Sequence, residues 1–411
     1  MNKLWQKLAI ATNWPVLVSV AVLSSLGIIS IWAEQADPKH KGDCAKQLIF
    51  LGVALACMTL FQGVNYLKIG RYAWTFYVVS LLLVLYTVAA SIKGGPNAVP
   101  GVHPLPGVGN VKGAYAWITI GPASNPISIE PAELCKFAFV MVLGRYLRFR
   151  SNYRTLGGLM VPFGLALLPM ALILKQPDLG MALLFLPALF VMLFVAGAKI
   201  RHLLAIAAIG MAIAPIAFFS GDKSVPLLSH FPRLVKPYQQ DRVHSYLDSF
   251  RHKPTKLEAQ STDYQTHHTL IAIASGGWSG KGFGEIPIGQ SIPEVHNDMI
   301  LALIGEQFGF WGVLALLVAY LVFFAAGIEI AAATREPFGR LVAVGVVAVL
   351  AAQSFFNLLV ATGLMPVTGI TLPFVSYGGS SLVASFMAAG LLLNIGQNRP
   401  MVMARESFEF N

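Results

Sequence analysis

A carboxylate-rich motif stands where a long polar segment gives way to an apolar helix. The motif is Pro293-Glu294-Val295-His296-Asn297-Asp298, and an unbroken apolar run begins at Met299. Six glycines and Lys281 precede it between residues 276 and 289. An ionised group at the edge of a membrane is costly, which points to a chemical task for Asp298, such as that of a general base. The alternative is a helix cap, a role for which Asn297 is equally suited.

A second acid and a base lie at the start of an apolar stretch, in Pro131-Ala132-Glu133-Leu134-Cys135-Lys136. Residues three apart share one face of a helix, so Glu133 and Lys136 are expected to pair. Pro131 is a normal signal for the first turn of that helix. Charged groups inside membranes tend to face cavities or substrate paths, which favours a functional pair over a purely structural salt bridge.

The segment Gln176-Pro177-Asp178-Leu179-Gly180 joins two apolar stretches with almost no loop. Pro177 forbids a continuous helix, and Asp178 is placed to cap the helix that follows. Capping accounts for Asp178 but not for Gln176 beside it. A capping role and a role in a binding site both stay open for this segment.

Gly280-Lys281-Gly282-Phe283-Gly284 has the glycine content of a phosphate-binding loop. It lacks the spacing of a nucleotide P-loop, which requires Gly at position 275 and Ser or Thr at position 282. Its backbone N–H groups and Lys281 could still meet a lipid diphosphate. Glu306, two turns into the next helix, is expected to be either buried and neutral or paired.

A run of small and irregular residues, 366–381, separates the last two apolar stretches and includes Ser376 and Ser380. Irregular backbone at membrane depth must be buried in protein or line a wet cavity. Small residues also permit close packing of helices. We favour the cavity, with Ser376 and Ser380 among its substrate-binding residues.

The composition is that of a polytopic membrane protein. Hydrophobic residues make up 56% of the 411 residues and charged residues only 12%, about half the charged fraction of soluble proteins. We predict an all-α fold in one domain, 1–411, with ten membrane-spanning helices. Their expected ranges are 14–33, 47–66, 72–91, 131–148, 156–174, 179–198, 202–219, 299–327, 341–363 and 378–397.

The distribution of lysine and arginine sets the orientation. With both termini cytoplasmic, the cytoplasmic segments hold fourteen of these residues and the short external segments six, which obeys the positive-inside rule. The net charge of +10 is mostly this excess, so nucleic-acid binding is not indicated. Two large external loops follow, about 92–130 and 220–298, and the second has a helix-like patch at 238–250.

Neither a disulfide framework nor a zinc site is expected. The three cysteines are scattered, with Cys57 and Cys135 inside predicted helices. The nine histidines show no paired metal-ligand spacing. Several acids and bases map to the external half of the predicted fold. Their convergence there is stronger evidence for a functional site than any single motif. They are Glu133, Lys136, Asp178, Lys281, Glu294 and Asp298.

In this order, the motifs resemble those of the SEDS family (shape, elongation, division and sporulation), the RodA/FtsW peptidoglycan polymerases. The likeness covers nearly the whole chain. The segments that carry it are 116–118, 130–136, 176–180, 273–277, 280–282, 293–298, 305–306 and 373–381.

The resemblance implies a ten-helix enzyme of the bacterial cytoplasmic membrane that polymerises lipid II on the outer face. A class B penicillin-binding protein would be its transpeptidase partner. Asp298 matches the essential loop aspartate of the family, Glu133 and Lys136 its intramembrane pair, and Trp117 its loop tryptophan. The chain departs from the family pattern at four positions, Ala116, Glu130, Met181 and Asn297.

The expected chemistry needs one base and some positive charge. Undecaprenyl diphosphate is a weakly basic leaving group, so no general acid is required, and Asp298 would activate the acceptor sugar hydroxyl. Glycosidases, by contrast, use two carboxylates. Positive charge for the diphosphate would come from Lys136, Lys281 and Arg242, or from a divalent cation such as Mg²⁺ or Mn²⁺.

Two other functions compete with this prediction. A lipid II flippase would also need a polar cavity, but transporter sites lie near the midplane, whereas the unusual residues here cluster at the outer rim. A pure scaffold leaves the buried charges unexplained. Within the family, Pro366-Val367-Thr368-Gly369-Ile370 favours the elongation branch over the division branch.

Overall fold

The chain is almost entirely helical. A computed structural model describes residues 13–34, 42–94, 105–109, 115–120, 127–176, 178–221, 230, 240, 243–244, 246 and 262–398. The long helices are α2 (Trp14–Glu34), α3 (Asp43–Gly63), α5 (Ala73–Gly94), α6 (Pro131–Arg148), α7 (Met160–Lys175), α9 (Phe185–Ala196), α10 (Ile200–Phe218), α13 (Ile300–Ala333), α14 (Pro337–Ala361) and α15 (Gly379–Gln397). The shorter elements are α4 (Tyr66–Arg71), α8 (Leu179–Leu183), α12 (Thr262–Ser275), the 3₁₀ turns η2 (Asn152–Arg154), η3 (Gly157–Leu159) and η5 (Gly289–Ser291), and the strands β1 (Ile118–Ile120) and β2 (Ile127–Ile129).

Within the described ranges, nine helical segments are long and apolar enough to cross a membrane, the continuous stretch Leu179–Ala196 counted as one. The remaining predicted span, α6, begins and ends where the sequence indicated. It has the length of a spanning helix but four charged residues, Glu133, Lys136, Arg145 and Arg148. The membrane fold is thereby confirmed, and the count of ten stays a prediction that depends on α6.

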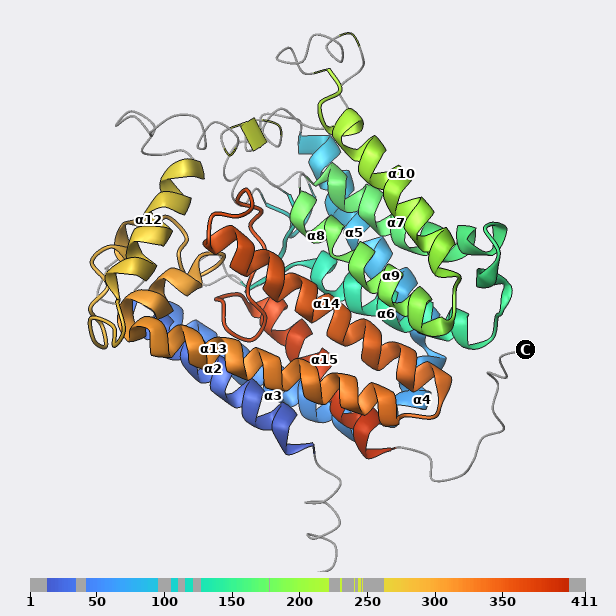
Figure 1. Cartoon of the computed structure of the whole chain (residues 1–411), viewed down its shortest axis with the longest axis horizontal. Helices are drawn as coiled ribbons and strands as arrows, with labels where there is room; N and C mark the ends of the chain where they lie inside the picture. The colour runs from blue at the N-terminus through green and yellow to red at the C-terminus, as the bar shows by residue number, and fades with distance from the viewer. Residues whose placement is uncertain are drawn as a thin grey trace, which may run out of the picture.

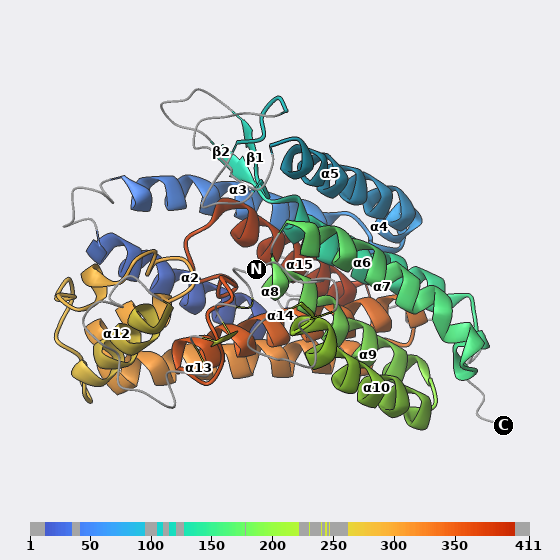
Figure 2. The same ribbon diagram turned by 90° about the horizontal axis from the view of Figure 1, so that it is seen from above.

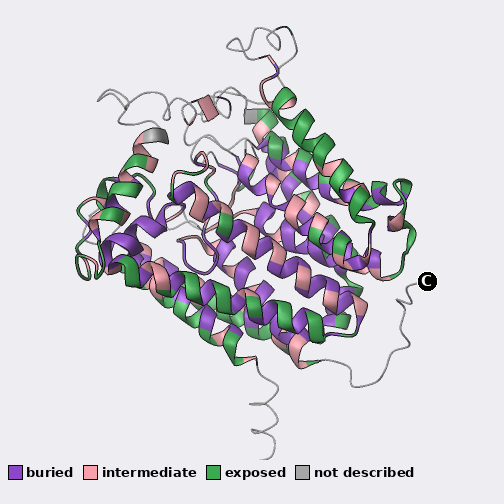
Figure 3. Ribbon diagram, in the orientation of Figure 1, coloured by how far each residue is buried: buried purple, intermediate pink, exposed green. Residues whose placement is uncertain are grey.

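The helices form one bundle in which α14 and α6 occupy central positions. In Figure 1, α13 and α2 run side by side along one edge, while α5, α7, α9 and α10 gather on the other. Figure 2, seen from above, places α3 beside α15 and α5 beside α6. Exposed residues concentrate on the outer helices, α10 above all, and buried ones within the bundle (Figure 3). This is the pattern of helices whose outer faces meet lipid.

Helix α6 tolerates its charges because protein surrounds it. It packs against α5, α14, α9, α15 and α7. Fourteen of its eighteen residues are buried, including Glu133 and Lys136. Charged side chains are therefore turned toward other helices and away from hydrocarbon, as expected for intramembrane charges.

Both predicted external loops contain regular structure that the sequence did not reveal. In the first, β1 and β2 form a small antiparallel hairpin, with Thr119 opposite Ser128. In the second, α12 and η5 precede the Asp298 motif. The helix-like patch at 238–250 lies largely outside the described residues.

Two predicted helices are interrupted. The span predicted at 179–198 divides at Leu184 into α8 and α9, where Pro187 has no N–H group to continue the hydrogen-bond ladder. The helix α13 extends six residues beyond the end predicted for this span. It is broken at Gly309, whose φ of 59° and ψ of −151° are not helical. Only glycine adopts that conformation readily.

Candidate active site

The buried ion pair on α6 is present as predicted. Lys136 Nζ lies 2.7 Å from Glu133 Oε2, with side chains 0% and 2% exposed. Lys136 also donates a hydrogen bond to Gln353 Oε1 on α14. Gln353 in turn donates to the carbonyl of Thr371 at 3.0 Å. The pair is thus fixed both within α6 and to the irregular segment before α15.

Other polar groups surround this ion pair. Trp117 hydrogen-bonds the side chain of Glu130, which precedes the first turn of α6. Removal from water and the neighbouring carboxylates Asp178 and Glu133 raise the pKa of Glu130 well above its ordinary value, against the opposite effects of Lys136 and of the bond to Trp117. The structure therefore gathers Trp117, Glu133, Lys136 and Asp178 around Glu130. Glu130, singled out in the sequence only as a departure from the family, belongs to this cluster.

Asp178 caps a helix, as one of its two expected roles required. Its Oδ1 accepts a hydrogen bond from the backbone N–H of Met181 at 2.9 Å, at the start of α8. Gln176 is buried and donates to Thr87 and to the carbonyl of Val84, both on α5. Gln176 thereby ties the end of α7 to α5, and no observation assigns it to substrate.

Asp298 lies in the turn before α13, and its residue is only 9% exposed. The N-cap position of α13 is occupied by Met299, which makes no side-chain capping bond. The backbone carbonyl of Asp298 accepts a hydrogen bond of 2.7 Å from Asn357 on α14. The same amide group donates to the carbonyl of Ile370, also at 2.7 Å. Asn357 thus holds Asp298 against the irregular segment before α15.

The loop that ends in Asp298 has a strained conformation. Glu294 has a φ of 55°, in the left-handed region. Residues other than glycine adopt this backbone conformation only at an energetic cost. Its carboxylate accepts a hydrogen bond of 2.6 Å from the side chain of Asn297. Glu294 remains 46% exposed, so the rim of the site carries an accessible acid beside the buried one.

Gln353 and Asn357 are functional candidates that the sequence reasoning missed. They lie four residues apart on α14 and therefore on one face of the helix. One contacts the ion pair of α6 and the other contacts Asp298. The available signal was two amide residues at helical spacing within an otherwise apolar run.

The glycine-rich loop packs into the break in α13. The backbone N–H groups of Lys281 and Gly282 donate to the carbonyls of Glu306 and Gln307 at 2.9 and 3.2 Å. In the opposite direction, the N–H groups of Phe310 and Trp311 donate to the carbonyls of Gly277 and Trp278 at 2.8 and 3.4 Å. These bonds satisfy backbone groups that the break in α13 leaves without helical partners. The Lys281 and Gly282 N–H groups are thus not directed at a diphosphate.

Glu306 is the anchor of this loop. It is fully buried, and its Oε1 lies 2.6 Å from Lys281 Nζ. Its two carboxylate oxygens also accept hydrogen bonds from the N–H groups of Ile288 and Gly289 at 3.1 and 2.7 Å. Of the two alternatives for Glu306, the paired one is observed, and the charge of Lys281 is matched within the protein.

The remaining predicted site residues are placed as follows. Ser376 is buried, accepts a hydrogen bond from the backbone N–H of Leu372 and stabilises the turn before α15. Ser380 lies in the first turn of α15 and is partly buried. Arg242 lies outside the described residues. Their roles toward substrate stay predictions.

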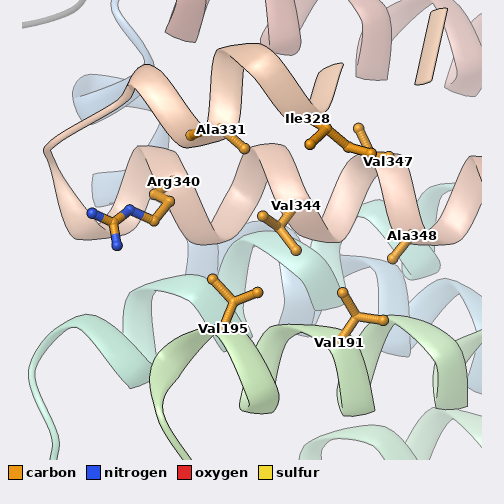
Figure 4. Close-up of a pocket in the computed structure, with 9 residues that line it drawn as sticks. Val191, Val195, Ile328, Ala331, Arg340, Val344, Val347 and Ala348 are labelled. Carbon is orange, nitrogen blue, oxygen red and sulfur yellow. The ribbon is translucent and has the colours of Figure 1, made fainter. Parts of the chain in front are cut away.

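No candidate residue lines the apolar pocket on the other side of the bundle. This pocket of about 440 Å³ lies between α9, α13 and α14 (Figure 4). Its walls are aliphatic, with Arg340 at one end. Within the described ranges, no group of three or more His, Cys, Asp or Glu residues is arranged to hold a metal ion.

The fold and these clusters define a class, the multi-pass membrane proteins with buried charges and a carboxylate at one rim of the bundle. The chain belongs to the FtsW/RodA/SpoVE family, described as cell cycle protein, which matches residues 7–400.

Relatives and solved structures agree with this assignment. The chain is 31% identical to the probable peptidoglycan glycosyltransferase FtsW of Trichlorobacter lovleyi, over 92% of this chain and 91% of the relative. A solved chain described under "Structural coordination of polymerization and crosslinking by a peptidoglycan synthase complex" matches with a TM-score of 0.74 and 29% identity, covering 95% of this chain and 99% of that one. The rod shape determining protein RodA of Thermus thermophilus matches with a TM-score of 0.64 and 27% identity, over 94% and 97%.

Proposed function

We propose that this chain is a peptidoglycan glycosyltransferase that polymerises lipid II at the outer face of the bacterial cytoplasmic membrane. Family membership and the name of the Trichlorobacter relative support the activity. The observation that carries the mechanism is Asp298, a mostly buried carboxylate whose backbone is held in place by Asn357.

In the proposed reaction, Asp298 acts as the general base. It accepts the proton of the acceptor sugar hydroxyl as the hydroxyl oxygen bonds to the anomeric carbon of the donor. The bond from that carbon to the diphosphate breaks, and undecaprenyl diphosphate leaves with the electron pair. Proton removal of this kind contributes typically about 10²–10⁴-fold to a rate.

The two lysines predicted to bind the diphosphate both form salt bridges within the protein, Lys136 with Glu133 and Lys281 with Glu306. We therefore assign the Glu133–Lys136 pair to positioning through Gln353. Arg242 and a divalent cation remain as sources of positive charge. Mg²⁺ or Mn²⁺ would be held chiefly by the substrate phosphates and by water.

A transpeptidase partner of the class B penicillin-binding type follows from the same proposal. The structural relative with the TM-score of 0.74 comes from a complex described as coordinating polymerization and crosslinking. The 366–370 segment favours the elongation branch, whereas the FtsW relative is the more similar in sequence, at 31% identity against 27% for RodA. A flippase function is the competitor, and the test below separates it from the enzyme.

The test is polymerisation of labelled lipid II by purified protein, with and without a transpeptidase partner. Wild type should form glycan strands resolved on a gel. Asp298→Asn should abolish them, because the amide keeps the shape of the side chain but lacks its basicity. The variant should retain the elution profile of wild type in detergent. Near-normal polymerisation by Asp298→Asn would refute the role of Asp298, and lipid II transport without polymerisation would favour the flippase.

A further inference from the structure

His296, two residues before Asp298, is a point at which three parts of the fold meet. It is 5% exposed. Its Nδ1 lies 3.1 Å from the carboxylate of Glu34, the last residue of α2. Its ring packs edge-on against Tyr377 with centroids 5.2 Å apart. Its backbone carbonyl accepts a hydrogen bond of 2.8 Å from the Tyr377 N–H.

Glu34 is an unusual residue for its position. It is the one charged residue of α2 and is only 3% exposed. A buried carboxylate is costly unless it is paired and hydrogen-bonded. The contact with His296 joins residues 262 positions apart in the chain. Helix capping or helix termination does not explain why Glu34 is buried against the loop that precedes Asp298.

The surroundings of His296 favour its charged form. Burial lowers its pKa, but the hydrogen bond and charge of Glu34, together with the charges of Glu294 and Asp43, outweigh burial and raise it. Glu294 Oε2 lies 3.8 Å from Nε2 on the other side of the ring. Tyr377 is neutral at physiological pH, since burial and Asp43 raise its pKa to about 12.

We propose that Glu34 and His296 are positioning residues, and that their contact fixes the Asp298 loop against α2 while Asn357 fixes it against α14. Neither residue exchanges protons with substrate. The inference rests on the proposed function in that Asp298 is taken as the base. It adds an anchor on α2, which bears no other proposed site residue.

The sign of the pH dependence follows from the direction of the shift. A histidine whose pKa is raised in the folded protein gives its stabilisation in full at low pH and loses it as the pH rises through the raised value. The anchor therefore weakens on the alkaline side.

The principal experiment compares Glu34→Gln with wild type in lipid II polymerisation across pH. Gln keeps the size and a hydrogen bond but removes the charge. We expect the alkaline limb of kcat to move to lower pH, because the charge of Glu34 no longer raises the pKa of His296, with KM changed less than kcat. The matched control is Glu329→Gln, which removes an exposed carboxylate from α13 and should leave the profile unchanged. An unmoved limb in Glu34→Gln would overturn the proposal.

A second measurement does not depend on catalysis. The titration of His296 is followed by NMR in protein with labelled histidine, and its signal is assigned by its loss in His296→Gln. The pKa of His296 should fall in Glu34→Gln and stay constant in Glu329→Gln.

Absence of any polymerisation by wild type would defeat the proposed function, whereas an unchanged His296 titration in Glu34→Gln would defeat the anchor. The double variant Glu34→Gln/His296→Gln should be no slower than His296→Gln alone, and additive losses would contradict the inference.

Discussion

The side-chain amide of Asn357 donates at 2.7 Å to the backbone carbonyl of Asp298. A second donation at 2.7 Å reaches the carbonyl of Ile370, so one residue of α14 holds the proposed base and the segment before α15 at a fixed separation. Asn357 is 1% exposed. Because Asn357 is buried, water does not readily replace these two bonds.

Replacing Asn357 with Leu should therefore reduce kcat for glycan synthesis. The change leaves two buried carbonyls without that donor, at about 1–3 kcal/mol each. Displacement of the base by about an ångström reduces rates by roughly 100-fold. Phe355→Leu, at an exposed position of the same helix, is the control. Equal rates for the two variants would show that Asn357 does not position Asp298.

The ion pair of α6 should behave as a unit. Glu133→Gln or Lys136→Met leaves one uncompensated buried charge, which destabilises by about 3–5 kcal/mol. The double variant should lose less than the sum of the two, because no isolated charge remains. Thermal unfolding in detergent and polymerisation rate provide the two readings. Fully additive losses would mean that Glu133 and Lys136 act independently.

The orientation in the membrane can be tested with single cysteines in a variant without Cys44, Cys57 and Cys135. Ser151 follows α6 and Ser291 precedes the Asp298 motif, and both are exposed. An impermeant thiol reagent should label position 291 but not 151 in intact cells, as the positive-inside distribution requires. Both should react after the membrane is permeabilised. Labelling of 151 alone in intact cells would reverse the assignment of the outer face.

Gly309→Ala should lower the Tm in detergent. Its φ of +59° disfavours any side chain, and an added Cβ would lie 2.4 Å from the backbone nitrogen of Gly280. Such strain costs on the order of 1–3 kcal/mol. Gly210→Ala on α10, where a Cβ meets nothing within 4 Å, is the matched control. Equal Tm values for the two variants would contradict a tight junction between loop and helix.

Features set by residues close together in the chain could be predicted from the sequence. The Pro131 start gave α6 its correct boundary, the spacing of Glu133 and Lys136 gave the ion pair, and Asp178 was recognised as a potential cap. The break in α8–α9 was missed, although Pro187 was visible, because the surrounding run is uniformly apolar.

The partners that hold the candidate site could not be read from the sequence. Glu34 and His296, or Asn357 and Asp298, are separated by 262 and 59 residues, and no pattern within a single helix links them. Lys281 was expected to face a phosphate because its loop is rich in glycine. The glycines instead allow the close approach of two backbones, as the short distances from a Cβ at Gly276 and Gly280 show.

The break at Gly309 divides α13 into two helical segments, one before and one after residue 309. Four backbone hydrogen bonds join the loop 277–282 to residues 306–311, and Glu306 adds its own contacts to Lys281 and Gly289. The turns of α13 that begin just after Asp298 are thus fastened to the preceding loop more firmly than a lone helix end would be. Because α12 packs against α13 at Gly305, a displacement of α12 would reach the turns that follow Asp298 before the turns beyond Gly309.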